Sequence, residues 1–342
     1  MNSTLKIYLS VITSLLLFCS CSDKQNNNQI NFKNIQFQYK EIKGIEKSAN
    51  ITRRDPSDII RFSGKYYLWY TKTDKGRSGY NATIWYATSV DGLLWNEIGE
   101  ALGRGNKGSW DEFSVFTPNI LVAENKYYLF YTAVKRTPNR NDFYFENNSK
   151  NDFTAIGIAV SNSPDESFTR IKGNPVLTVS NYLSSFDSYR VDDACIIVRD
   201  NKYWLYYKGR SLIYGASGPA NTKMGVAFAN NPEGPYQKYY RNPVVSSGHE
   251  VVVWPFNEGV MTLISAVGEN GKTIQFADDG LNFKILSKID DNYPNAPGCF
   301  RADNFIDKQN IELNNFWGIS MNHGNNEIWP YLIRYDFTFP KD

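Results

Sequence analysis

The segment "GKYYLWYT", residues 64–71, recurs twice further along the chain. "NKYYLFYT" occupies residues 125–132, and "NKYWLYYK" occupies residues 201–208. Aromatic residues dominate every copy, which is typical of β-strands. A strand motif that repeats in this way predicts a fold built from copies of one β-unit.

Each copy lies between two further predicted strands. A short apolar run precedes it, and a run such as "ATIWYATS", residues 82–89, follows and leads to a polar turn. A looser fourth copy begins at "VVVWPFNEGVMTLIS", residues 251–265, and a fifth runs from "RADNFI", residues 301–306, to "WPYLIRYDF", residues 329–337. Five copies of about four strands each predict an all-β protein, a five-bladed β-propeller.

Composition is consistent with this fold and argues against one class of partner. The chain has 342 residues, 15% of them aromatic, and a formal net charge of +2. Because positive and negative charges are interspersed, no basic field favours nucleic acid.

The N-terminus is predicted to direct export. Residues 1–20 resemble a lipoprotein signal peptide, with Lys6 before an apolar stretch and Ser20 directly before Cys21. Lipidation of Cys21 would anchor the chain to a membrane, with residues 21–35 as a polar tether and residues 36–342 as the propeller domain. An ordinary secretory signal is the alternative. Both interpretations predict an exported protein, in the periplasm, outer membrane or cell surface of a Gram-negative bacterium.

The propeller domain retains two cysteines, Cys195 and Cys299. No metal-ligand spacing such as CxxC occurs, and both residues lie in hydrophobic contexts. An oxidising compartment allows a disulfide between them, but we expect two buried small apolar residues.

The residue that opens the first strand of each copy is a candidate site residue. The innermost strands of a propeller line its central channel, so their first residues should meet at one mouth. The five predicted openers are Asp55, Thr117, Asp192, Glu250 and Asp303.

Four of these openers are acidic, and repeated carboxylates can separate acid and base roles by raising one another's pKa. The alternative is that each acid pairs with a nearby arginine, such as Arg54 or Arg190. Since Glu250 is joined by His249, one of only two histidines, we interpret the set as an active site.

Four stretches carry a family resemblance: "RRDPSDII", "SVFTPNIL", "SYRVDDACIIVRDNKYWLYYKGR" and "GHEVVVWP". With them the chain resembles glycoside hydrolase family 117, five-bladed relatives of the family 43 furanosidases, over about residues 36–336. The resemblance implies exo-acting, inverting hydrolysis of the α-1,3 bond of agar-derived oligosaccharides, with release of 3,6-anhydro-L-galactose.

The resemblance also implies roles for individual residues. Asp55 matches the catalytic base, Asp192 the carboxylate that modulates the pKa of the acid, and Glu250 the third acidic residue. His249 matches a histidine that serves as general acid in relatives, so the acid is either His249 or Glu250. Neighbours on a strand point opposite ways, and both can face the channel only if the backbone at Gly248 is irregular. The predicted substrate-binding set is Trp85, Thr117, Asp303 and Arg54.

Two further features stay open. Some relatives are described as zinc-dependent, so a divalent cation is an alternative, although the residues show only scattered carboxylates and two histidines and no metal ligand is assigned. Family members often begin with a helical arm that swaps between subunits. No such helix is readable here, which leaves a homodimer open.

Three alternative functions remain. A related furanosidase or an anhydro-D-galactosidase would share the acidic ring and differ in its sugar. A non-catalytic glycan-binding surface lipoprotein would belong to another functional class. It predicts a ring interrupted by neutral residues, whereas Asp55, Asp192 and Glu250 are all acidic.

Overall fold

The computed structural model describes residues 35–74, 81–134, 154–248, 251–265, 268–307, 316–322 and 327–338. These residues belong to one compact unit, Asn31–Asp342. The predicted signal peptide, Cys21 and residues 21–34 lie outside the described residues. Within the described ranges, no helix is both long enough and apolar enough to cross a bilayer.

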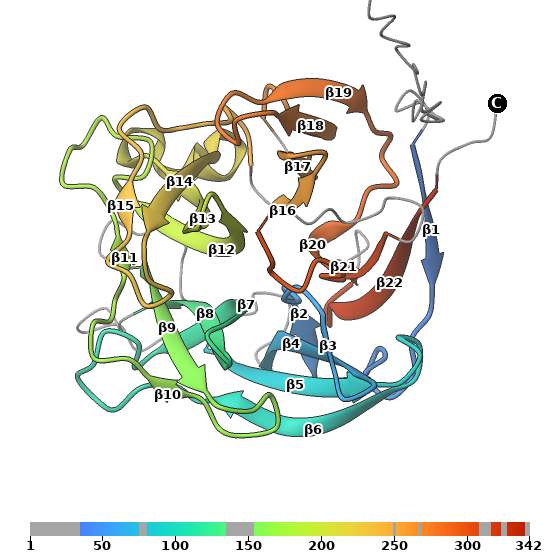
Figure 1. Cartoon of the computed structure of the whole chain (residues 1–342). Coiled ribbons are helices and arrows are strands. Elements are labelled where there is room, and N and C mark those ends of the chain that lie inside the picture. The colour runs from blue at the N-terminus through green and yellow to red at the C-terminus, as the bar shows by residue number, and fades with distance from the viewer. Residues whose placement is uncertain are drawn as a thin grey trace, which may run out of the picture. The chain divides into compact units, whose positions relative to one another are not determined.

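Five antiparallel sheets surround a common centre as the blades of a propeller (Figure 1). Blade 1 contains β2 (Thr52–Arg54), β3 (Ile60–Phe62), β4 (Lys65–Thr73), β5 (Thr83–Ser89) and β6 (Trp95–Leu102). Blade 2 contains β7 (Ser114–Ala123), β8 (Lys126–Val134), β9 (Thr154–Ser161), β10 (Thr169–Arg170) and β11 (Leu177–Thr178). Blade 3 contains β12 (Arg190–Arg199), β13 (Lys202–Arg210), β14 (Lys223–Ala229) and β15 (Gln237–Lys238). The prediction of a five-bladed β-propeller is confirmed.

Blade 4 contains β16 (Val251–Phe256), β17 (Gly259–Ile264), β18 (Thr273–Ala277) and β19 (Lys284–Lys288). Blade 5 combines β20 (Asn295–Cys299), β21 (Trp317–Asn322) and β22 (Tyr331–Thr338) with β1 (Gln36–Lys40) from the start of the domain. The pairing of β1 with β22 closes the ring, which leaves no blade without its outer strand (Figure 1). This strand was not predicted from the sequence.

The second strands of four blades begin directly after tight turns. Both residues of the turn have positive φ angles at Ser63-Gly64, Glu124-Asn125, Asp200-Asn201 and Asn257-Glu258. Two residues of this conformation form the hairpin turn whose twist matches that of the flanking strands. A local chain property therefore joins the first two strands of four blades.

The second strand of each blade is covered on both faces by side chains of its neighbours. In β4, Leu68, Trp69 and Tyr70 have no exposed surface. Trp69 is thus a core residue, as its place in a repeated strand indicates. Cys195 and Cys299 are free thiols and buried, as expected.

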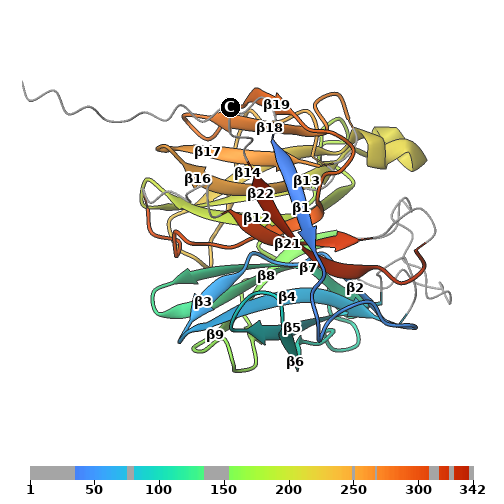
Figure 2. The ribbon, with the colours of Figure 1, turned by 90° about the vertical axis from the view of Figure 1, so that its right-hand side faces the viewer.

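A 3-10 helix, η3 (Leu212–Asn221), connects β13 to β14 and projects from one edge of the propeller (Figure 2). Ser211 caps its first turn, accepting a hydrogen bond from the backbone N–H of Ile213.

Candidate active site

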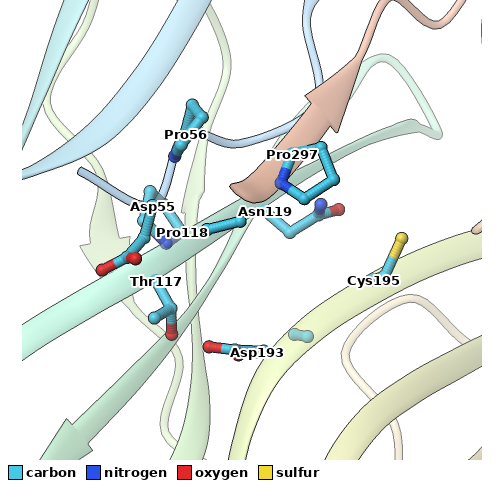
Figure 3. A pocket seen from close by; sticks show the side chains of 10 residues that line it. Asp55, Pro56, Thr117, Pro118, Asn119, Asp193, Cys195 and Pro297 are labelled. Carbon is cyan, nitrogen blue, oxygen red and sulfur yellow. The ribbon is translucent and has the colours of Figure 1, made fainter. Parts of the chain in front are cut away.

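A pocket lies where the innermost strands of four blades meet (Figure 3). Its cavity volume is about 40 Å³, which has room for water molecules. The lining residues are Asp55, Pro56, Thr117, Pro118, Asn119, Asp193, Ala194, Cys195, Ala296 and Pro297.

The same irregular backbone conformation places one residue from each of these four blades in the pocket. Asp55, Thr117, Asp193 and Ala296 have positive φ angles between 41° and 51°. Pairing with the second strand is interrupted at the last three of them, at Phe116/Asn119, Asp192/Cys195 and Asn295/Gly298, and in blade 1 at the gap between β2 and β3. An interruption of this kind re-aims a side chain that strict alternation would direct elsewhere. Positive φ is unfavourable for residues other than glycine, so the surrounding structure must hold it.

Threonines of neighbouring blades hold two of these turns. Thr71 Oγ1 accepts a hydrogen bond of 2.9 Å from the backbone N–H of Thr117, in the next blade. Thr132 Oγ1 in turn accepts one of 3.2 Å from the N–H of Asp193 and lies 2.5 Å from Thr117 Oγ1. Hydrogen bonds therefore join blade 1 to blade 2 and blade 2 to blade 3 beside the pocket.

Asp55 enters the pocket from blade 1. Its Oδ2 accepts a hydrogen bond of 2.8 Å from Arg54 Nε. Arg53 turns instead to Glu97, where Nε and Oε1 are 2.9 Å apart. One of the two arginines before Asp55 thus contacts it, and the other belongs to a separate ion pair.

Asp193 enters the pocket from blade 3. Its carboxylate contacts the ammonium group of Lys208, on β13. Burial raises the pKa of Asp193 to about 7, and the Asp192 and Asp55 carboxylates add to the rise, while Lys208 opposes it. Figure 3 shows the oxygens of Asp55, Thr117 and Asp193 gathered at one end of the pocket.

The prediction that Asp192 opens the strand and faces the channel is wrong by one residue. Asp192 has no exposed surface and pairs with Arg190, while its Oδ1 is 3.5 Å from Lys208 Nζ. Burial would raise its pKa, but these two cations hold it below the ordinary value.

The error has an identifiable cause. Asp55 lies ten residues before Lys65, and Asp192 lies ten before Lys202. However, Thr117 lies only nine before Lys126, as Asp193 does before Lys202. Blade 1 carries one residue more between its turn and its repeated strand, so its spacing does not transfer to blade 3.

The prediction for Asp303 is also corrected. The innermost strand of blade 5 begins at Asn295, so Ala296 occupies the position assigned to Asp303. Asp303 follows that strand in a turn and is 1% exposed. It pairs with the buried Arg301, with 2.7 Å between Arg301 Nη2 and Asp303 Oδ2. The ring of acids is therefore smaller than predicted.

The tryptophans do not line this pocket. Trp85 donates from Nε1 to Thr83 Oγ1 at 3.0 Å, and the Lys72 ammonium lies 3.4 Å from the centre of its ring. Trp110 stacks on Tyr131 with ring centres 5.7 Å apart. A sugar contact at Trp85 stays a prediction.

His249, Glu250 and His323 lie outside the described residues. The part of the chain that is described holds no group of three His, Cys, Asp or Glu side chains that could bind a metal ion.

Two acids, the partly exposed Asp193 and the buried Asp58, were not predicted from the sequence. Asp193 carries a signal, because it is followed by a small residue and a strand at the same spacing as Thr117. Asp58 is completely buried, and its partners are Cys299 and Arg301, more than 240 positions away along the chain. No local pattern could indicate such a partner.

Comparisons with known proteins agree with this geometry. Residues 49–193 match the model of glycosyl hydrolases family 43. Among solved structures, Zg3597, a family 117 glycoside hydrolase produced by the marine bacterium Zobellia galactanivorans, is 32% identical, with 92% of this chain and 94% of that chain covered and a TM-score of 0.75. The search of curated proteins found no match.

More distant structures share the fold alone. The GH32 beta-fructofuranosidase BmSUC1 of Bombyx mori is 13% identical, with 87% of this chain and 61% of that chain covered and a TM-score of 0.57. Fructan 1-exohydrolase IIa from Cichorium intybus is 12% identical, with coverages of 87% and 57% and a TM-score of 0.57.

Fold, pocket and relatives together define a propeller glycoside hydrolase. The chain belongs to glycoside hydrolase family 117.

Proposed function

We propose that the enzyme is an exo-acting, inverting hydrolase of the α-1,3 bond of neoagarooligosaccharides and releases 3,6-anhydro-L-galactose. Two things support this substrate: the chain belongs to family 117, and "RRDP", "VDDA" and "GHE" all resemble that family's motifs. The observation that carries the chemistry is the pair formed by Asp55 and Asp193, two carboxylates from different blades in one pocket.

Asp55 is proposed as the general base. Arg54 occupies Oδ2, so Oδ1 is left to take a proton from water while the water oxygen attacks the anomeric carbon. The bond from that carbon to the leaving oxygen breaks, and the leaving oxygen receives a proton from the general acid, His249 or Glu250. Inversion requires room for the water, with acid and base about 6.5–9.5 Å apart.

Asp193, rather than Asp192, is proposed as the carboxylate that modulates the acid. Asp193 lines the pocket, whereas Asp192 is buried and forms an ion pair with Arg190. With a pKa of about 7, Asp193 changes charge near neutral pH, which would alter the proton affinity of a neighbouring acid.

The first test is the product profile of the protein without residues 1–35 on neoagarobiose and neoagarotetraose, beside Asp55→Asn. We expect the wild type to release anhydrogalactose with inverted anomeric configuration, followed by proton NMR, and the variant to release it at least about 100-fold more slowly. A folded wild type that cleaves neither sugar overturns the agar assignment. Cleavage of carrageenan-derived or arabinan oligosaccharides would then identify an anhydro-D-galactosidase or a furanosidase, and binding without cleavage a glycan-binding protein.

Export and anchoring at Cys21 form a separate part of the proposal. We expect the full chain to incorporate labelled palmitate when expressed in a Gram-negative host and Cys21→Ser to incorporate none. Equal labelling of both would contradict lipidation at Cys21.

A further inference from the structure

Lys208 breaks a pattern that blades 1 and 2 share. It lies six residues after the lysine that begins its strand, as Thr71 and Thr132 do in β4 and β8. Each of the three pairs with the residue just before the pocket turn of its own blade: Arg54, Phe116 and Asp192 respectively. A buried lysine thus stands where the fold elsewhere places a threonine.

The exchange changes what this position can do. The two threonines accept hydrogen bonds from the pocket turn of the following blade through Oγ1. A lysine ammonium only donates, so it cannot accept from a backbone N–H. Lys208 instead contacts the Asp193 carboxylate and lies 3.5 Å from Asp192 Oδ1.

The charges around Asp193 make this contact specific. From β12, Asp192 shares Lys208 with Asp193, its Oδ1 lying 3.5 Å from Lys208 Nζ, and also pairs with Arg190. From blade 1, Asp55 faces Asp193 and repels it, while Arg54 is paired with Asp55. Within the ranges that the structure describes, Lys208 is the cation in contact with Asp193.

We propose that Lys208 is a positioning residue of the site, which holds the Asp193 carboxylate at the pocket and sets the pH range over which it ionises. A buried cation in contact with a carboxylate favours its charged form. Because only 9% of the Lys208 side chain is exposed, solvent and salt screen its positive charge little. The inference rests on the proposed function only where activity is the readout.

The test uses the residue that the fold itself places here. Lys208→Thr copies blades 1 and 2 and removes the charge, and Lys208→Arg keeps it. Lys238→Thr is the matched control, because it removes another lysine–aspartate pair of blade 3, to Asp187, away from the pocket.

Thermal unfolding from pH 5 to pH 9 tests the inference without any substrate. We expect the upper end of the stability decline that Asp193 causes with rising pH to move up by about 1–3 pH units in Lys208→Thr, while its lower end, set by the unfolded state, stays near pH 4. The decline should stay near its wild-type position in Lys208→Arg and Lys238→Thr, and disappear when Asp193→Asn is added to Lys208→Thr.

Activity gives the second readout. The limb of the kcat/KM profile on neoagarobiose that Asp193→Asn abolishes should shift upward in Lys208→Thr by a similar amount. A Lys208→Thr protein that loses the same stability at every pH, with or without Asp193, would show a merely structural lysine and overturn the proposal. If the wild type cleaves no sugar, the proposed function fails, while the unfolding experiment still decides the role of Lys208.

Discussion

Two pairs of carboxylates near the centre of the propeller differ in the positive charge around them. Asp55 and Asp193 line the pocket, each in contact with one cation, Arg54 or Lys208. Asp58 and Asp303 lie behind the pocket and share one fully buried arginine, Arg301. The first pair keeps side-chain exposures of 11% and 18%, whereas the second has at most 1%.

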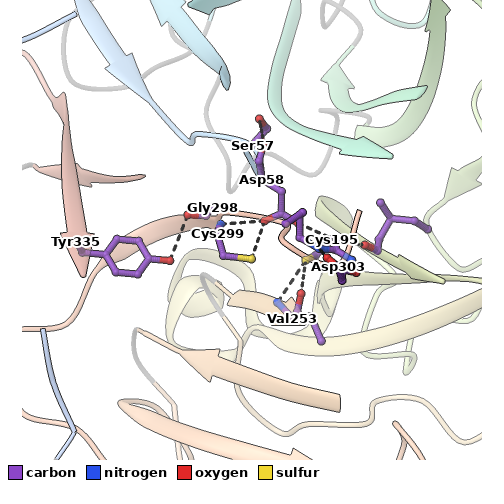
Figure 4. Close-up of polar contacts among 10 residues, drawn as sticks. Ser57, Asp58, Cys195, Val253, Gly298, Cys299, Asp303 and Tyr335 are labelled. Carbon is purple, nitrogen blue, oxygen red and sulfur yellow. Dashed lines mark hydrogen bonds and ion pairs between the residues drawn. The ribbon is translucent and has the colours of Figure 1, made fainter. Parts of the chain in front are cut away.

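The second pair forms a complete hydrogen-bonded network. Arg301 also donates to the backbone oxygen of Ile196 in blade 3 at 2.8 Å. Asp58 accepts from the backbone N–H of Cys299 at 3.0 Å, and the Cys299 thiol lies 3.4 Å from the same oxygen (Figure 4). Blades 1, 3 and 5 are thereby joined next to pocket residues. A buried network whose hydrogen bonds are all made stabilises one arrangement of its side chains. Two carboxylates that stay partly exposed, with one cation each, are better suited to take part in a reaction.

The largest expected difference between the two carboxylate pairs is in catalysis. Asp55→Asn removes the proposed base with little change of shape, so kcat should fall by about 10²–10⁴-fold. The urea midpoint of unfolding should stay close to that of the wild type. If activity survives, or if the midpoint falls as far as in an Arg301 variant, the distinction between the two pairs fails.

The next effect is on stability. Arg301→Met leaves two buried carboxylates without their cation and should cost about 3–5 kcal/mol, measured by urea unfolding. Lys272→Met, which removes an exposed pair with Asp291, is the control and should leave the midpoint nearly unchanged. A loss as small as that of the control would show that the network contributes little.

A smaller, pH-dependent effect belongs to Asp193. Its folded pKa of about 7 exceeds that of an unfolded aspartate, about 3.9, so the folded state binds more protons between these values. Wild-type stability should therefore fall as pH rises from about 4 to 7. The melting temperature of Asp193→Asn should therefore rise relative to that of the wild type as the pH increases from 5 towards 8. A constant difference for Asp193→Asn would mean that Asp193 does not titrate there.

The smallest effect concerns substrate contact. Thr117→Val keeps the β-branched shape and removes a hydroxyl at the pocket, so kcat/KM should fall by about 2–10-fold, equivalent to one hydrogen bond. Kinetics on neoagarobiose would measure it. An unchanged kcat/KM would indicate that Thr117 Oγ1 serves only Thr132.

Much of the fold was predictable because it depends on local patterns. The repeated strand at residues 64–71 and its copies predict the propeller, and the Arg-Asp-Pro stretch points to Asp55, which lines the pocket. The outer strand β1 was not predicted, since its partner β22 lies about three hundred residues away and five residues carry little periodicity.

The sequence by itself determined the number of blades and their hairpins, because strand patterns and two-residue turns are encoded by neighbouring residues. Only the tertiary structure decided which acids face the pocket. Asp192 and Asp193 are adjacent, and the irregular turn with positive φ at Asp193 reverses the side that alternation would assign. Likewise, Asp58 and Asp303 became structural only because folding placed Arg301 between them.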